Sequence, residues 1–258
     1  MQSETTTPQA VTVRTPQGED GAQAPAVLLR DIRHDFGDLH VLAGLTLEVA
    51  AGETVALVGP SGCGKSTLLE IACGLQRPSS GTVAATPAAL VPQRDALLPW
   101  ADALDNAALP LRLQHVTRAE ARRRAEPLLA ELGLSGFERA RPAQLSGGMR
   151  QRVAFARALL TGRDVLCLDE PFGALDAITR AEIHRWLAGA LAVQPRTVLL
   201  VTHDIEEALV LADRVCVLSP RPARIVAELA VPGARPRDPA DPALIALRRQ
   251  ALEALRAC

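Results

Sequence analysis

The segment 59–67 (GPSGCGKST) most constrains the fold of this chain, because it follows the apolar run TVALV and opens a helical pattern. Glycines at such a turn let successive backbone N–H groups point at a polyphosphate, and the N-terminus of the following helix adds positive potential. Lys65 is expected to reach the β- and γ-phosphates of ATP, and the Ser66 hydroxyl to bind Mg²⁺. An ordinary glycine-rich turn is the alternative, and chance gives this pattern in roughly 1% of chains of this length. The residues predicted to contact the nucleotide here are Gly59, Ser61, Gly62, Cys63, Gly64, Lys65, Ser66 and Thr67.

Strand-like and helical segments alternate along the rest of the chain, which predicts an α/β fold. Runs such as VALV and VLCL are continuously apolar, as expected of strands buried on both faces of a mainly parallel sheet. Strands are expected at 27–32, 45–49, 54–58, 89–91, 165–168, 198–202 and 214–218, and helices beginning at Gly64, Ser146 and Ile205.

The stretch 96–143 carries no strand signal. It contains a capping box, Thr117 followed by Glu120, and the helix that this box opens is expected to end near Gly133. The pattern predicts an α-helical subdomain, at about 96–158, inserted into an ATPase domain of residues 26–230.

The two ends of the chain differ in composition from its middle. Residues 1–25 are rich in Thr, Gln, Pro and Gly and have neither a basic start nor an apolar run, so we expect a disordered extension and no signal peptide. Residues 231–258 are expected to form a Pro-rich linker and an amphipathic helix, in which Leu244, Leu247, Leu252 and Leu255 recur at helical spacing. No segment approaches the roughly 20 uninterrupted apolar residues that span a bilayer.

Charge and cysteine content exclude several classes of protein. The 28 basic and 29 acidic side chains give a formal net charge of −1, which argues against a nucleic-acid partner. Lys65 is the only lysine among the basic residues. The five cysteines, Cys63, Cys73, Cys167, Cys216 and Cys258, show no CxxC spacing, so we expect neither a disulfide framework nor a zinc site. A reducing cytoplasm fits this usage.

Two carboxylates, Asp169 and Glu170, follow the apolar run VLCL. Alone, two acids after a strand usually mark a turn. After a phosphate-binding loop they predict catalytic chemistry, with Asp169 holding the metal and its water shell. Glu170 is then placed to orient and deprotonate the attacking water.

The segment 145–151 (LSGGMRQ), continued as RVAFARAL, resembles the signature of the ABC ATPase family. Met149 stands where that family usually has Gln. Ser146, Gly147 and Gly148 expose N–H groups at a helix N-terminus and are expected to form a second phosphate site. The resemblance implies a P-loop NTPase (RecA-like) core with antiparallel N-terminal strands. It also implies two copies that sandwich ATP head to tail, the signature of one facing the phosphate loop of the other.

Four further residues match motifs of this family in the expected order. Gln93 resembles the glutamine that contacts Mg²⁺ and the water, although Pro92 before it departs from the pattern, and Asp176 ends a D-loop-like GALD. His203 resembles the switch histidine that contacts the γ-phosphate. Phe36 lies 23 positions before Gly59 (59 − 36), the interval of the aromatic residue that stacks on adenine, although it could instead be a core residue.

A finer resemblance, to the nitrate, sulfonate and taurine branch of bacterial importers, lies in LLPW (97–100), EPFGALDAITR and the stretch 201–225. It implies an ATP- and Mg²⁺-dependent ATPase on the cytoplasmic face of the inner membrane, with integral membrane permease subunits and, indirectly, an extracytoplasmic solute-binding protein as partners. Leu98, Pro99 and Trp100 become candidates for docking the membrane subunit, unless Trp100 packs inside the helical part. The alternatives are a soluble ABC ATPase of DNA repair or translation and the motor of an exporter or lipid-extracting complex.

Overall fold

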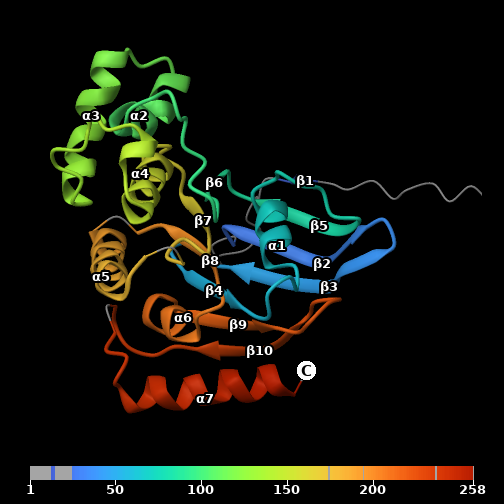
Figure 1. Cartoon of the computed structure of the whole chain (residues 1–258). Coiled ribbons are helices and arrows are strands. Elements are labelled where there is room, and N and C mark those ends of the chain that lie inside the picture. Colours follow the sequence, from blue (N-terminus) through green and yellow to red (C-terminus); the bar gives the residue numbers. More distant parts are fainter. Residues whose placement is uncertain (1–12, 15–24, 174, 194, 236, 258) are drawn as a thin grey trace, which may run out of the picture.

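The computed structural model describes residues 13–14, 25–173, 175–193, 195–235 and 237–257. These residues form two sheets, a group of helices beside them and a C-terminal helix along one edge (Figure 1). The extension expected at 1–25 lies outside the described residues except for 13–14 and 25, and Val13–Arg14 form the short strand β1.

The larger sheet has six strands in the order β10-β9-β4-β8-β7-β6. Its strands are β4 (Thr54–Val58), β6 (Ala88–Val91), β7 (Val165–Asp169), β8 (Thr197–Thr202), β9 (Arg214–Leu218) and β10 (Ile225–Ala230). All are parallel except β10, which pairs antiparallel with β9 at the edge. Every residue of β4 and β8 is buried, which explains their unbroken apolar sequences.

The smaller sheet has the order β1-β5-β2-β3 and contains the antiparallel N-terminal strands that the family resemblance implies. Its hairpin joins β2 (Val27–Phe36) to β3 (Leu39–Val49) through a two-residue turn in which Gly37 has φ +58°. Both strands are longer than expected from the sequence. Strand β5 (Ser80–Ala85) pairs with β2 on the side away from β3. It was not expected, because its sequence SGTVAA has few bulky residues.

The region 96–158 is helical throughout its regular elements. It contains α2 (Ala103–Leu113), α3 (Arg118–Glu131), the short 3₁₀ helix η1 (Pro142–Gln144) and most of α4 (Gly147–Leu159), which Figure 1 shows grouped beside the sheets. Thr117 caps α3 by accepting a hydrogen bond from the Glu120 N–H, 3.4 Å away. The Glu120 carboxylate pairs with Arg123 and Arg124 rather than closing the expected box.

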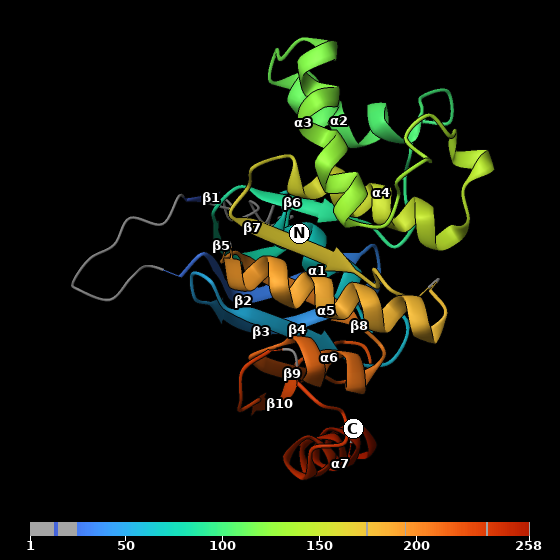
Figure 2. The same ribbon diagram turned by 90° about the vertical axis from the view of Figure 1, so that its left-hand side faces the viewer.

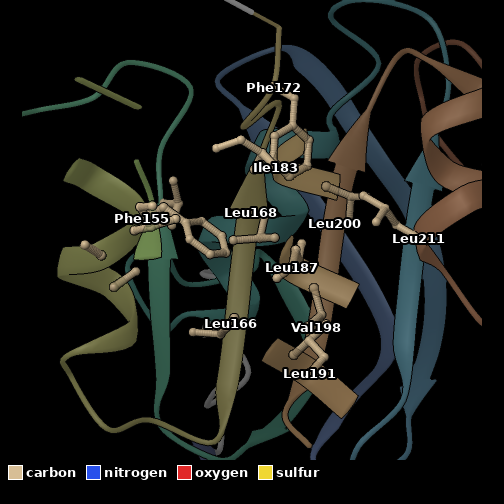
Figure 3. Packing of buried hydrophobic residues seen from close by; sticks show 14 of the residues in the cluster. Phe155, Leu166, Leu168, Phe172, Ile183, Leu187, Leu191, Val198, Leu200 and Leu211 are labelled. Atoms are coloured by element: carbon tan, nitrogen blue, oxygen red, sulfur yellow. The ribbon is translucent and has the colours of Figure 1, made fainter. Parts of the chain in front are cut away.

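Alternate residues of the central strands enter two different cores. On one face, Val165 and Cys167 of β7 join α1 (Lys65–Ala72) and the smaller sheet. On the other face, Leu166 and Leu168 meet side chains of α5 (Ala177–Val193), as Figure 3 shows. Figure 2 shows α5 lying across β7 and β8. This two-sided burial fixes the strand ends, and therefore the loops that follow them.

The C-terminal segment is anchored to the larger sheet. The guanidinium of Arg237 is buried and donates to the carbonyl oxygens of Ala212 (2.7 Å) and Val231 (3.1 Å), so residues before the helix are held in place. Helix α7 (Pro242–Arg256) then packs against α6 (Ile205–Leu211), β9 and β10. Leu244 is buried as expected, whereas Leu252 is exposed.

Candidate nucleotide-binding and hydrolytic site

The strand order brings four separate sequence motifs to one edge of the larger sheet. The phosphate loop follows β4 and His203 follows β8. Strand β7 ends at Asp169, with Glu170 directly after it, and Gln93 follows β6. These strands are neighbours and parallel, with Val58 opposite Thr202, Val201 opposite Asp169 and Leu168 opposite Val91. The carboxyl ends of parallel strands meet at the same edge, which is where ligands bind in open α/β sheets.

The phosphate loop is built on glycines whose backbone other residues could not adopt. Gly62 has φ +74° and Gly64, which caps α1, has φ +117°. A Cβ at Gly64 would lie 2.7 Å from Cγ1 of Val41, and one at Gly59 would lie 3.0 Å from the carbonyl oxygen of Leu218. The loop therefore packs closely between β3 and the end of β9, and this packing holds its backbone in the conformation that would bind an anion.

Lys65 places a buried positive charge inside this cradle. Its side chain is only 5% exposed, and Nζ donates to the carbonyl oxygens of Gly59 (2.9 Å) and Pro60 (3.0 Å). No carboxylate among the described residues pairs with it. A buried ammonium without an anionic partner is costly, so the site favours a bound anion.

Ser66 and Asp169 form a pair of oxygen donors next to the lysine. The Ser66 hydroxyl donates to Oδ1 of Asp169 at 3.1 Å. Burial raises the pKa of Asp169, the hydrogen bond from Ser66 opposes that rise, and the charge of neighbouring Glu170 adds to it. Mg²⁺ binds hard oxygen ligands and would relieve the repulsion between two adjacent carboxylates. The residues present therefore fit this ion.

Glu170 is held by two polar side chains and by an unusual backbone. Its Oε2 accepts from Nε2 of Gln93 at 3.1 Å and lies 3.3 Å from Nδ1 of His203. Its φ of +44° is in the left-handed region, which is uncommon for a non-glycine residue. Strained backbone of this kind is concentrated at functional sites.

Lys65, Ser66, Gln93 and Glu170 line one cavity of about 390 Å³. Asp169 and His203 are not among its described lining residues, but contact it indirectly through Ser66 and Glu170. Phe36 lies at its wall and is 50% exposed, so the alternative in which Phe36 packs in the core is wrong. Three lining residues were not foreseen, namely Leu39 and Val41 of the first hairpin and Arg221 after β9, because no local motif surrounds them. The described lining residues are Phe36, Leu39, Val41, Ser61, Gly62, Gly64, Lys65, Ser66, Thr67, Gln93, Glu170 and Arg221.

Cys63 differs from its neighbours in the phosphate loop because its side chain is buried and does not line the cavity. Burial raises the pKa of the Cys63 thiol, and the positive charge of Lys65 opposes that rise. The thiol is therefore directed away from the cavity, and contact with a nucleotide would come from the backbone at this position.

The signature segment and Asp176 lie outside the part of the cavity wall that the structure describes. Ser146 caps α4 by accepting from the N–H of Met149 at 3.2 Å, and a Cβ at Gly148 would lie 2.8 Å from Leu175. Asp176 caps α5, with Oδ1 accepting from the N–H groups of Ile178 (3.1 Å) and Thr179 (3.0 Å). The N–H groups of the first turn of α4, which begins at Gly147, form a separate helix terminus.

Arginines of α4 tie the segment after Gln93 to the signature helix, which sequence patterns did not reveal. Arg150 Nε donates to Oδ2 of Asp95 at 2.8 Å. Arg157 donates to the carbonyl oxygens of Asp95 (2.8 Å) and Ala96 (2.9 Å). These bonds attach α4 to the segment that follows Gln93.

The LLPW loop continues from that segment and presents an exposed aromatic side chain. Trp100 is 72% exposed, so the alternative in which it packs inside the helical part is wrong. The buried side chain of Asn106 holds the loop backbone in place, because it hydrogen-bonds to both the N–H and the carbonyl of Leu98. Aromatic residues are enriched at protein–protein interfaces.

Comparison with known proteins identifies what these features resemble. The model of the ABC transporter family matches residues 42–173. The chain is 50% identical over 231 residues (87% of this chain and 91% of the relative) to the aliphatic sulfonates import ATP-binding protein SsuB 1 of Rhodococcus jostii. It is 47% identical over 228 residues (82% and 87%) to the taurine import ATP-binding protein TauB of Chromobacterium violaceum.

Solved structures agree with the fold. The dimeric ATP-binding cassette MJ0796, bound to ADP and Pi, superposes with a TM-score of 0.74 and 31% identity, covering 80% of this chain and 99% of the cassette. No described helix has the length and apolar content that crossing a membrane requires. With this fold, the family match and relatives of such identity over most of its length, the chain belongs to the ABC transporter family.

Proposed function

We propose that this chain is the ATP-hydrolysing subunit of a bacterial importer for an aliphatic sulfonate such as taurine, or for a similar small anionic nutrient. The observation that carries the ATPase part is the convergence of Lys65, Ser66, Gln93 and Glu170 on one cavity at the carboxyl ends of adjacent strands. The importer part rests on the names of the two relatives described above, which are import ATP-binding proteins for aliphatic sulfonates and for taurine.

In this proposal the phosphate loop binds the nucleotide and Lys65 exchanges its two carbonyl partners for the β- and γ-phosphates. Phe36 stacks on the adenine, which its exposed ring at the cavity wall permits. Ser66, Gln93 and Asp169 would hold Mg²⁺, which when bound supplies positive charge to the phosphates and to the leaving group.

Glu170 acts as the general base in the same proposal. Its carboxylate accepts a proton from the attacking water, and the contacts with Gln93 and His203 fix its orientation. Once the water is positioned, His203 is free to contact the γ-phosphate. Positioning and electrostatic stabilisation supply most of the catalysis of phosphoryl transfer.

A second copy of the chain completes each site. Ser146, Gly147 and Gly148 lie at a helix N-terminus outside the described cavity wall, so a partner's signature can close the site from the open side. Asp176 would contribute near that junction. The dimeric state of the related cassette supports this arrangement.

The remaining partners follow from an importer role. The chain would act at the cytoplasmic face of the inner membrane, with permease subunits docking at Leu98, Pro99 and Trp100. An extracytoplasmic solute-binding protein would deliver the nutrient to those subunits. The alternatives of a DNA-repair or translation ATPase and of an exporter motor have no support among the relatives described above.

Glu170→Gln tests the catalytic part, with the exposed Glu182→Gln as the control. The Glu170 variant should bind Mg-ATP, hydrolyse it about 100-fold or more slowly, and accumulate as an ATP-bound dimer on gel filtration. Near-normal turnover would reject Glu170 as the base. Uptake of radiolabelled taurine by cells that carry Glu170→Gln tests the transport part, which fails if uptake continues unchanged.

A further inference from the structure

We propose that Arg221 is a nucleotide-binding residue whose guanidinium contacts the phosphate chain of a bound nucleoside di- or triphosphate. The inference rests on the proposed ATPase function and adds a residue to that site. Arg221 lies in the loop 219–224, between β9 and β10, at the end of the stretch 201–225 that resembles the importer branch but to which the resemblance assigns no nucleotide contact beyond His203. It lines the same cavity as Lys65, Phe36 and Glu170.

The topology explains how this loop reaches the nucleotide site. Strand β9 is parallel to β4, with Val217 opposite Val58, so the loop after β9 leaves the sheet beside the phosphate loop. The loop is also joined to the first hairpin, because Ala223 donates to the Val41 carbonyl (2.8 Å) and accepts from the Ala43 N–H (3.1 Å). Arg221 is thus fixed between the hairpin that carries Phe36 and the phosphate loop.

The side chain points at the apex of the phosphate loop. Its Nη2 lies 3.7 Å from the position that a Cβ would take on Gly62. The positive charge also acts on the interior of the loop: burial raises the pKa of the Cys63 thiol, and the charges of Lys65 and Arg221 both oppose that rise. Arg221 therefore approaches the loop from the solvent side, whereas Lys65 is buried within it.

The charge of Arg221 has no counterion in the described part of the chain. Its guanidinium forms neither an ion pair nor a hydrogen bond there, whereas Arg150 and Arg157 of α4 are bonded to Asp95. An arginine held at an anion-binding loop and left unpaired suits a phosphate, because its planar N–H groups match phosphate oxygens. A nucleotide bound in the cavity would supply the missing anion.

Arg221→Gln tests this assignment, with Arg224→Gln as the matched control, because Arg224 is an exposed arginine of the same loop and does not line the cavity. Binding of Mg-ATP, Mg-ADP and adenosine is measured by calorimetry and competition at several salt concentrations. Arg221→Gln should bind Mg-ATP and Mg-ADP roughly tenfold more weakly and leave adenosine binding unchanged. The loss should shrink as salt rises, and Arg221→Lys should recover part of the affinity.

Each result has a defined meaning. If Arg221→Gln binds Mg-ATP as tightly as the wild type, the assignment is wrong. The assignment is also wrong if adenosine binding falls as much as Mg-ATP binding. It is wrong as well if nucleotide-free Arg221→Gln melts at a lower temperature than the wild type and Arg221→Lys behaves in the same way, because Arg221 would then only support the loop. If the wild type and Arg224→Gln both fail to bind Mg-ATP, the proposed ATPase function fails as well.

Discussion

Asn106→Ala tests whether one buried amide holds the loop that presents Trp100. Asn106 is 0% exposed. Its Oδ1 accepts from the Leu98 N–H at 2.7 Å, and its Nδ2 lies within hydrogen-bond distance of the carbonyl oxygens of Leu98 (3.1 Å), Ala101 (3.1 Å) and Asp102 (3.0 Å). Without the amide, the carbonyl oxygens of Leu98 and Asp102 each still accept a hydrogen bond from a backbone N–H.

Truncation therefore leaves two backbone groups without a partner, the Leu98 N–H and the Ala101 carbonyl. An unsatisfied buried group costs about 1–3 kcal/mol, and partial solvation of the loop lowers that cost, so we expect a loss of about 2–4 kcal/mol. For a chain of this size that loss corresponds to a fall in Tm of roughly 4–16 °C. The loop should loosen more than the rest of the fold, because the orphaned groups lie within it.

Urea unfolding and amide hydrogen exchange measure the two effects. Gln114→Ala is the control, since Gln114 is exposed and its side chain makes one hydrogen bond, to the Thr161 carbonyl at 3.2 Å. We expect the control to lose at most about 1 kcal/mol. A loss below about 0.5 kcal/mol in Asn106→Ala, or unchanged exchange of the Leu98 amide, would refute the reasoning.

Two other variants and one labelling experiment test the site and its surroundings. Burial raises the pKa of Glu207 from 4.5 to about 8, so the folded state favours the neutral acid and loses stability as pH rises through that range. Glu207→Gln should therefore gain up to roughly 3 kcal/mol relative to wild type between pH 4.5 and 7 in urea unfolding, and parallel pH profiles would contradict this. Ser146→Arg should bind ATP as a monomer but neither dimerise nor hydrolyse, and hydrolysis by a dilute monomer would exclude the composite site. Mg-ATP should protect Lys65 from an amine-selective reagent, which peptide mass spectrometry detects, and equal labelling with and without nucleotide would remove Lys65 from the site.

The expected strands and helices that the structure reproduces are those whose signal is local. The run TVALV is apolar at every position because β4 is buried on both faces. The helices that open with a capping residue, at Thr117 and Ser146, begin where the sequence indicates. The elements that were missed include β1, β5, β10 and α5, which have weak local patterns and depend on their neighbours in the fold. Strand β10 is an edge strand with alternating exposure and a central Glu228.

The sequence by itself determined the chemistry of the site, because a phosphate loop and a pair of acids after a strand are specified within a few neighbouring residues. The tertiary structure decided which groups share the cavity. The strand order joined Gln93 to Glu170, 77 residues apart, and the hairpin contact brought Arg221 to Gly62. The tertiary structure also placed Asn106 where its side chain hydrogen-bonds to the backbone of the loop that carries Trp100. Such contacts depend on how distant segments pack, and packing is a property of the whole chain that no short motif contains.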